Sequence, residues 1–335
     1  MAVSEPTPST VYDLLIIGAG PAGLAAGYRA EQAGLSYLIL EKGIIAQTVY
    51  NYPIGKPLFS TPNEVELAPG TLKPKNEKPT REEVLAYYNQ FALREHRMRI
   101  HLHESVHQIL READGRFLIV TPKAMYRAHR VLVATGGFGL PRKLGVPGET
   151  ESRVSYRFVE AFAYGGQDVL VVGGGNSAAE AVLFLHEGGA NVSWSLRRPT
   201  IGPRSGDKDK IGVKPWVRAP IEQLEAKGEI NIIYSSTIAE VLPDEALLKI
   251  EGQTELLRVP CSHIFALLGA DPDVTLLRTT GAEIASDGRP VYNPETYETT
   301  IPGLFVAGHL TREMHMKNAV AVPPRVVEKM LAHSE

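Results

Sequence analysis

Two short glycine-rich segments offer bare backbone at spacings suited to binding a pyrophosphate. The first reads Gly18-Ala19-Gly20-Pro21-Ala22-Gly23, and the second reads Gly173-Gly174-Gly175-Asn176-Ser177-Ala178. In this pattern the first glycine permits a tight strand-to-helix turn, the second admits the pyrophosphate, and the last small residue lets the helix pack on the strand. One such segment is a weak indication. Two predict a protein that holds two dinucleotides and passes electrons between them.

The first segment lies inside a complete βαβ pattern. Residues 11–17 form an apolar, branched run typical of a buried parallel strand, and residues 24–33 form an alanine-rich helical stretch. A second strand, Ser36–Leu40, ends at Glu41, about 20 residues past the glycines, where an acid accepts from ribose hydroxyls. We interpret this unit as the adenosine site of FAD; the alternative is a tight turn that binds nothing.

The second segment repeats the pattern with a different ending. Residues 168–172 are expected to be a strand, 176–187 a helix and 190–196 the next strand, which ends in Arg197-Arg198. An acid at this point favours the free 2′-hydroxyl of NAD, whereas arginine favours the 2′-phosphate of NADP because its planar fork donates in pairs. We therefore predict an NADPH site. The alternative is two solvated charges on a loop.

Composition restricts the class of protein. The chain has 335 residues, enough for two domains, with 44% hydrophobic and 22% charged residues and a net charge of −3. No basic excess indicates nucleic acid or an anionic membrane surface as a partner, and no apolar run is long enough to cross a bilayer. Residues 1–10 lack the pattern of a secretory signal. We expect a cytoplasmic protein.

The chain has one cysteine, Cys261, so it cannot form an internal disulfide, a dithiol redox pair or a cysteine-based metal site. A mixed disulfide remains conceivable. Because Cys261 precedes the apolar segment 264–268, we predict a half-buried structural thiol rather than a reactive one.

Between the two units, residues 43–79 are expected to be irregular, and Thr80-Arg81-Glu82-Glu83 forms a capping box that starts a helix running to about Glu95. Strands are predicted over 100–106 and 117–121. His101 and His103 would then share a strand face, but spacing fixes no third ligand, and no metal site is predicted.

The end of the chain returns to the first domain. Residues 130–136 form a strand ending in Ala134-Thr135-Gly136, and 299–308 form another strand rising to a glycine turn. The predicted fold class is α/β, with two Rossmann-like, three-layer ββα dinucleotide-binding domains. The expected boundaries are 1–140 with 273–335 for FAD, and 141–272 for NADPH.

The order of these motifs resembles the low-molecular-weight thioredoxin-reductase-like flavoproteins over nearly the whole chain. Within that group the chain is most similar to the bacillithiol-disulfide (bacilliredoxin) reductases. The segments that carry this similarity are Tyr50-Asn51-Tyr52-Pro53, Val146-Pro147-Gly148-Glu149, Val154-Ser155-Tyr156, Lys214-Pro215-Trp216 and Gly288-Arg289-Pro290-Val291-Tyr292-Asn293. The resemblance implies a homodimer whose NADPH domain rotates on hinges near Leu140-Pro141 and Gly269-Ala270-Asp271.

The chain departs from these relatives at four points. Residues 150–172 contain no Cys-x-x-Cys, and Ala22 stands where the bacillithiol branch usually has cysteine. His309 replaces the aspartate that usually binds the ribityl-phosphate region of FAD, and a further arginine, Arg204, comes later than in the reductases. A dithiol relay is therefore excluded, and reduced flavin would have to pass its electrons on directly.

These arguments give a set of candidate residues. The predicted FAD-binding residues are Gly18, Gly20, Pro21, Ala22, Gly23, Glu41, Lys42, Asn51, Val106, Thr135, Gly136, Gly308 and His309. The predicted NADPH-binding residues are Gly173, Gly175, Asn176, Ser177, Ala178, Arg197 and Arg198. Tyr50, Tyr52 and Lys214 are candidates for the substrate side of the flavin, with packing as the alternative for the tyrosines.

Three functions follow, in decreasing order of preference. The first is an NADPH-dependent reductase of a low-molecular-weight thiol disulfide. The second is an electron-transfer reductase for a small redox protein, like the ferredoxin or flavodoxin NADP reductases. The third is a flavin-binding sensor without turnover.

Overall fold

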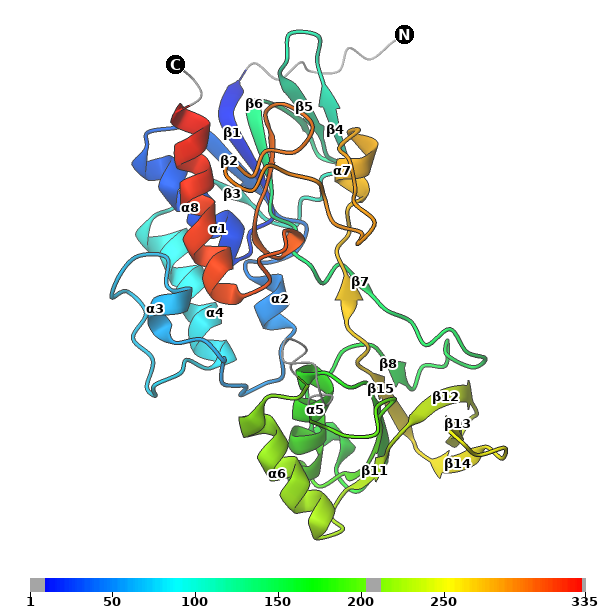
Figure 1. Ribbon diagram of the computed structural model, residues 1–335. Coiled ribbons are helices and arrows are strands. Elements are labelled where there is room, and N and C mark those ends of the chain that lie inside the picture. Colours follow the sequence, from blue (N-terminus) through cyan, green and yellow to red (C-terminus); the bar gives the residue numbers. More distant parts are fainter. Residues whose placement is uncertain (1–9, 203–211, 333–335) are drawn as a thin grey trace. The chain divides into compact units, whose positions relative to one another are not determined.

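The computed structural model describes residues 10–202 and 212–332, which fall into two compact units. The first unit comprises Met1–Tyr50, Gly55–Leu140 and Asp271–Glu335, and the second comprises Asn51–Ile54 and Pro141–Ala270 (Figure 1). Arg204 lies outside the described residues.

The first unit is built on a mixed sheet with the strand order β3-β2-β1-β6-β5-β4, and β17 also pairs with β6. Its strands are β1 (Val11–Ile17), β2 (Tyr37–Leu40), β3 (Ile100–His101), β4 (Gln108–Arg111), β5 (Phe117–Val120), β6 (Met125–Val133) and β17 (Leu304–Val306). Its helices are α1 (Pro21–Gln32), α2 (Gln47–Tyr50), α3 (Pro62–Val65), α4 (Arg81–Gln90), the π-helical turn η1 (Phe91–Glu95), α7 (Thr275–Thr279), the short turn η3 (Gly308–Leu310) and α8 (Met316–Ala332).

The long strand β6 has two different neighbours on one side. Its first half pairs antiparallel with β5, with Phe117 opposite Ala128, and its second half pairs parallel with β17, with Leu304 opposite Val131. Because β5 and β4 turn away where β17 begins, the β4–β5 hairpin forms a separate layer. Strands β1, β2, β3 and β17 all run parallel to β6 or to one another, so their carboxyl ends meet at one edge.

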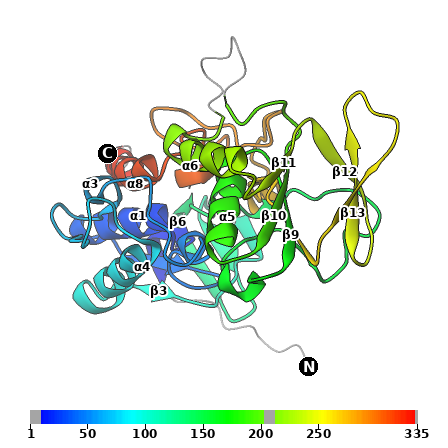
Figure 2. The same ribbon diagram turned by 90° about the horizontal axis from the view of Figure 1, so that it is seen from below.

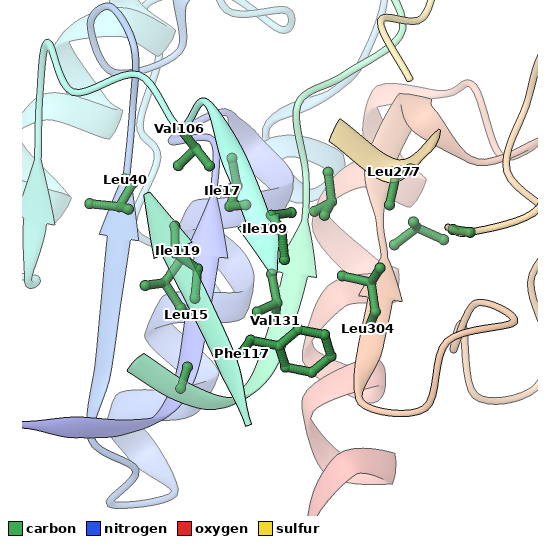
Figure 3. Packing of buried hydrophobic residues seen from close by; sticks show 14 of the residues in the cluster. Leu15, Ile17, Leu40, Val106, Ile109, Phe117, Ile119, Val131, Leu277 and Leu304 are labelled. Carbon is green, nitrogen blue, oxygen red and sulfur yellow. The ribbon is translucent and has the colours of Figure 1, made fainter. Parts of the chain in front are cut away.

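The second half of β1, Leu14–Ile17, is buried on both faces, which explains why these four residues are all apolar. Leu15 and Ile17 face one side, where they join residues of β4, β5, α7 and β17 in a single core (Figure 3). Ile16 lies on the other side, toward α1, and helix α8 packs beside α1. Alternate side chains of β1 therefore pack against two different layers, the β4–β5 hairpin on one face of the sheet and helix α1 on the other.

The second unit has a parallel sheet with the order β11-β10-β9-β15-β8 and an antiparallel sheet with the order β12-β13-β14. Its strands are β8 (Val154–Ser155), β9 (Asp168–Val172), β10 (Asn191–Ser195), β11 (Asn231–Ile233), β12 (Ser236–Val241), β13 (Glu245–Ile250), β14 (Leu257–Pro260) and β15 (His263–Ala266). Its helices are η2 (Phe162–Tyr164), α5 (Asn176–Glu187) and α6 (Pro215–Ala226). Helix α5 lies along β9 and β10, as Figure 2 shows.

Besides the short segment Asn51–Ile54, the chain crosses between the units at β7 (Leu140–Pro141) and β16 (Ala270–Asp271), which pair as a two-stranded ribbon. The segments expected to be hinges lie in this ribbon. Within the second unit, the amide of Arg142 also donates to the carbonyl of Gly269 at 3.0 Å.

Two sequence-based expectations for the first unit are wrong. The strand predicted over 100–106 is only Ile100–His101, because the backbone of His103 has a positive φ of 54° and leaves the sheet. His101 and His103 therefore do not share a strand face. The segment 43–79, expected to be irregular, contains the short helices α2 and α3, and the predicted capping box at Thr80 and Glu83 is present.

No described helix combines the length and apolar character needed to cross a membrane. Among the described residues, no three His, Cys, Asp or Glu side chains are grouped to hold a metal ion.

Candidate functional site

The turn between β1 and α1 has the shape that binds a pyrophosphate. Gly18 has a φ of +108°, and a Cβ added to Gly23 would lie 1.8 Å from the carbonyl oxygen of Gly18, so neither position admits a side chain. A Cβ added to Gly20 would instead meet no described atom within 4 Å. Gly20 is the N-cap of α1, and no described side chain caps this helix. The first turn of α1 therefore has no side-chain cap, and its amides are potential donors for an anion.

Two further turns meet this one at the carboxyl ends of the parallel strands. A Cβ on Gly18 would lie 2.6 Å from the carbonyl oxygen of Ala134, which follows β6. A Cβ on Gly308, which follows β17, would lie 2.8 Å from the Cβ of Ala22. A Cβ on Gly137 would lie 2.7 Å from the carbonyl oxygen of His309. The structure thus brings together three predicted segments that are distant in sequence.

Glu41 closes this edge of the sheet at the end of β2. Its buried carboxylate accepts the amide of Ala19 at Oε2, 2.8 Å away, and the amide of Gly43 at Oε1, 2.7 Å away. A carboxylate has about four acceptor sites, so these bonds leave capacity for ribose hydroxyls. Glu41 therefore both fixes the glycine turn and remains a suitable acceptor.

His309 carries a buried ring nitrogen, Nε2, with no hydrogen-bond partner among the described residues. Burial lowers the pKa of His309, and the nearby positive charge of Arg289 lowers it further, while a hydrogen bond to the backbone of His315 opposes both effects. The ring packs edge-on against Phe138, with centroids 5.6 Å apart. An unpartnered buried polar atom costs free energy, and a bound polar ligand would remove that cost.

The other predicted FAD residues occupy varied positions. Pro21 begins α1, Gly136 has a φ of +81°, and Lys42 and Thr135 are exposed. The side chain of Val106 is buried in the core, so only its backbone could contact a ligand. Asn51 groups with the second unit.

The turn between β9 and α5 repeats the first one. Gly173 has a φ of +135°, and its Cβ would lie 2.3 Å from the carbonyl oxygen of Leu267. A Cβ on Gly175, the N-cap of α5, would meet no described atom within 4 Å. Ser177 is exposed, and the small side chain of Ala178 is fully buried against the turn.

The two arginines that follow β10 have different surroundings. Arg198 donates from Nη2 to the carbonyl oxygen of Gly174, so it shapes the glycine turn. Arg197 is exposed and has no ion pair with any described residue. Arg197 is therefore the one whose guanidinium is available for a phosphate.

Helix α5 gathers two of the three candidate substrate-side residues. The amide of Lys214 donates to Oδ1 of Asn176 at 2.9 Å, and the charge of Glu180 acts on Tyr52. Asn176 and Glu180 are four residues apart and share one face of α5. Burial, with a smaller contribution from Glu180, raises the pKa of Tyr52 to about 12, so the phenol stays protonated and can donate.

Tyr50, the third candidate, belongs to the first unit. Its side chain is 49% exposed, and its carbonyl oxygen accepts from the guanidinium of Arg81 at 2.7 and 3.1 Å. The Arg81 guanidinium also lies 5.2 Å from the centre of the Tyr50 ring.

The surroundings of the single thiol are those of a structural residue and not of a reactive one. Cys261 is 2% exposed, and Arg153 donates to its carbonyl oxygen at 2.7 Å. Burial raises the pKa of the thiol. A buried thiol with a raised pKa is a poor nucleophile.

Two residues of these sites escaped the sequence reasoning. Arg289 donates to the carbonyls of His309, Leu310 and Thr311 and so holds the turn that carries His309. The indole of Trp194 donates to the carbonyl of Gly173 at 2.7 Å. Arg289 is twenty residues from its partners, and nothing in the sequence pattern indicates the contact.

Comparison with known proteins agrees with this architecture. The family model described as pyridine nucleotide-disulphide oxidoreductase matches residues 15–308. The bacilliredoxin reductase of Bacillus subtilis is 33% identical over 295 residues, which is 88% of each chain. The bacillithiol disulfide reductase structure from Staphylococcus aureus is 28% identical, covers 96% of this chain and 99% of its own, and has a TM-score of 0.89.

A ferredoxin–NADP reductase of Ignicoccus hospitalis is 26% identical over 313 residues, covering 89% of this chain and 90% of its own. The predicted α/β fold class, the resemblance to thioredoxin-reductase-like flavoproteins and the prediction of an oxidoreductase enzyme are confirmed. Such enzymes use a flavin and a pyridine nucleotide. With a family match across most of its length, the chain belongs to the pyridine nucleotide-disulphide oxidoreductase family.

Proposed function

We propose that this protein is an NADPH-dependent FAD enzyme that reduces a low-molecular-weight thiol disulfide such as bacillithiol disulfide. The observation that carries the proposal is the pair of open, uncapped helix starts at Gly20 and Gly175, one in each unit. The similarity to bacilliredoxin and bacillithiol disulfide reductases supports the substrate class. By the same similarity we expect a cytoplasmic homodimer.

The residues of the first unit fit FAD. The first-turn amides of α1 would bind its pyrophosphate, Glu41 would accept from the ribose hydroxyls, and the turn held by Arg289 would present His309. Because the pKa of His309 is lowered, its imidazole is neutral at pH 7 and can accept a hydrogen bond from a hydroxyl group. It could thus replace the aspartate found in relatives.

The residues of the second unit fit NADPH. The first-turn amides of α5 would bind the pyrophosphate, and the exposed Arg197 would bind the 2′-phosphate. Arg198 keeps the glycine turn in shape through the carbonyl of Gly174. When bound, the two cofactors supply the redox chemistry: a hydride from NADPH, relayed as an electron pair through FAD.

The chain offers no thiol for a covalent step with the substrate. Ala22 occupies the first turn of α1, and Cys261 is buried with a raised pKa. The overall reaction converts one disulfide, one NADPH and one proton into two thiols and NADP⁺. We therefore propose that the disulfide accepts its electrons without a mixed disulfide to the protein.

A second candidate is a reductase of a small redox protein such as ferredoxin. The absence of a second cysteine favours it, because transfer to a one-electron carrier needs no protein dithiol. The similarity to ferredoxin–NADP reductases points the same way. The sensor alternative is not favoured, because the chain belongs to a family of enzymes.

Steady-state assays separate the two enzymes. We expect anaerobic NADPH oxidation to accelerate with bacillithiol disulfide and less with glutathione disulfide or cystine. A control variant, Cys261→Ser, should keep the wild-type rate. The proposal is wrong if no disulfide accelerates the reaction, and rapid reduction of oxidised ferredoxin in the same assay would establish the second candidate.

A further inference from the structure

A buried carboxylate of the first unit lies outside the contacts proposed for the cofactors. Glu104 comes three residues after β3 and is 4% exposed. Its Oε1 accepts the hydroxyl of Thr121 and the hydroxyl of Tyr126, each at 2.8 Å. Nδ1 of His101 lies 3.2 Å from Oε2. Glu104 thus joins the segment after β3 to the end of β5 and the start of β6.

Glu104 carries a charge at neutral pH. Burial alone would raise the pKa of its carboxyl group, but the hydrogen bonds from Tyr126 and Thr121, together with the charge of His101, outweigh burial and lower the pKa. Burial and the Glu104 carboxylate in turn raise the pKa of Tyr126, so its phenol stays protonated and can donate. Hydrogen bonds to an ionised acceptor are roughly twice as strong as neutral ones, so this network holds its members firmly.

The same segment is bound to the end of β2 through the backbone. The amide of Glu104 donates to the carbonyl oxygen of Glu41 at 2.8 Å, and the amide of Glu41 donates to the carbonyl oxygen of His101 at 2.9 Å. The amide of His103 donates to the carbonyl oxygen of Gly43 at 3.1 Å. Three hydrogen bonds from the segment after β3 therefore hold the turn after β2.

The backbone at His103 adopts an uncommon conformation. Its φ of 54° lies in the left-handed region, which is unfavourable for residues with a Cβ. Such a conformation persists where neighbouring contacts hold it. The carboxylate of the next residue, Glu104, supplies such contacts through Thr121 and Tyr126. Without them we expect the backbone at His103 to relax, which weakens its hydrogen bond to Gly43.

The orientation of the Glu41 carboxylate depends on this turn. Its Oε1 accepts the amide of Gly43 at 2.7 Å, and its Oε2 accepts the amide of Ala19 at 2.8 Å. A displacement of Gly43 would therefore rotate the carboxylate and move its remaining lone pairs. Those lone pairs are the acceptors left for a ribose hydroxyl.

We propose that Glu104 is a positioning residue for the adenosine ribose of FAD, because its carboxylate fixes the turn that orients Glu41. This inference rests on the proposed function, in which Glu41 accepts from a ribose hydroxyl. Glu104 acts through Glu41 and needs no contact with the cofactor, since both of its carboxylate oxygens have partners within the chain.

The preference for ADP over 2′-deoxyADP measures the hydrogen bond between Glu41 and the ribose 2′-hydroxyl. Isothermal titration calorimetry gives both dissociation constants on the full chain, stripped of flavin and saturated with NADP⁺ to fill the second unit. We expect the wild type to bind ADP roughly tenfold to a hundredfold more tightly than 2′-deoxyADP, as for a hydrogen bond to a charged acceptor. Glu104→Gln should reduce this ratio by about three- to tenfold, because a displaced Glu41 makes a poorer hydrogen bond. A purely structural defect would weaken both ligands equally and leave the ratio unchanged.

Glu112→Gln is the matched control. Glu112 is also a carboxylate of the first unit with charge-assisted bonds, but its partner is Arg127, at 2.9 and 3.0 Å. Its replacement should lower the free energy of unfolding and leave the ratio unchanged. Tyr126→Phe removes one hydroxyl donor from Glu104 and keeps its charge. It should also reduce the ratio, which provides a test if Glu104→Gln does not fold.

A lower ratio in Glu104→Gln and Tyr126→Phe, with Glu112→Gln like the wild type, supports the proposal. An unchanged ratio in both of the first two variants, or an equal fall in Glu112→Gln, would overturn the role of Glu104 alone. A wild type that binds FAD but does not distinguish the two nucleotides would remove Glu41 from the ribose site and the role of Glu104 with it. A wild type that does not bind FAD would contradict the proposed function as well.

Discussion

Replacing Gly20 by alanine should separate folding from cofactor binding. Gly20 has a φ of −76° and a ψ of −179°, a conformation that alanine adopts without strain. A Cβ there meets no described atom within 4 Å, so the protein itself does not exclude the methyl group. The proposed pyrophosphate would have to occupy that same space.

The two effects differ in size. At the N-cap, replacing glycine by alanine lowers the stability of the helix by up to about 1 kcal/mol. The same change restricts the unfolded chain, which raises the free energy of unfolding by a comparable amount, about 0.4–1 kcal/mol. The free energy of unfolding of the apoprotein should therefore change by about 1 kcal/mol or less. Displacing the pyrophosphate costs at least one charge-assisted hydrogen bond of about 1.5–3 kcal/mol, or roughly tenfold to a hundredfold in FAD affinity.

Urea unfolding followed by circular dichroism measures the first quantity, and titration of flavin fluorescence with apoprotein measures the second. Gly175→Ala is the matched control, since its Cβ is equally unobstructed but lies in the second unit. It should leave FAD affinity unchanged and weaken NADPH binding instead. Gly23→Ala is the opposite control: its Cβ would lie 1.8 Å from the carbonyl oxygen of Gly18, and it should destabilise the apoprotein by about 1–3 kcal/mol or more.

Wild-type FAD affinity in Gly20→Ala would refute the placement of the pyrophosphate over this glycine. If Gly20→Ala lowered the free energy of unfolding as much as Gly23→Ala does, the space beside Gly20 would not be open. Exchange of the two phenotypes, with Gly175→Ala losing FAD, would assign the cofactors to the opposite units.

Further predictions concern the arginines, two half-buried histidines and the thiol. Arg197→Ala should reduce the preference for NADPH over NADH, measured as the ratio of their kcat/KM values, without changing stability. An unchanged ratio in Arg197→Ala would contradict this. Arg198→Ala should weaken the binding of both nucleotides, because it removes the hydrogen bond to the carbonyl of Gly174. The pKa values of His263 and His309 are lowered from 6.5, mainly by burial. Below about pH 6.5 the unfolded chain therefore binds more protons than the native state, and the free energy of unfolding of the apoprotein should fall as the pH decreases. Urea titrations at pH 5.5 and 7.5 measure this difference in the free energy of unfolding. His309→Gln should make the difference smaller. Cys261 should resist alkylation by iodoacetamide in the native protein and react only on unfolding; rapid labelling of native protein, seen by mass spectrometry, would show that the thiol is accessible.

Much of the fold was predictable because the signals are local. The predicted helix over 176–187 coincides with α5, and the strand predicted over 168–172 coincides with β9, since glycine turns and apolar runs fix both ends of each element. The prediction of a strand over 100–106 failed because apolar residues continue to alternate past His101, although the backbone bends there and leaves the sheet at His103, where φ is positive. Alternation records which side chains are buried, not whether the backbone pairs.

The candidate site was predictable to a lesser degree. Glycine spacing located both turns, but it did not distinguish Arg197 from Arg198, whose roles differ through one contact with Gly174. It also gave no indication of Arg289, which acts on residues twenty positions away.

The sequence by itself determined the two βαβ units with glycine turns, the absence of a dithiol and the candidate residues for phosphate, because each depends on residue type and short-range spacing. Only the tertiary structure decided which turns meet at one sheet edge, and that Nε2 of His309 is buried without a partner among the described residues. Parallel strands bring together the ends of segments far apart in the chain, and the crossover lengths that align them carry no mark in local sequence.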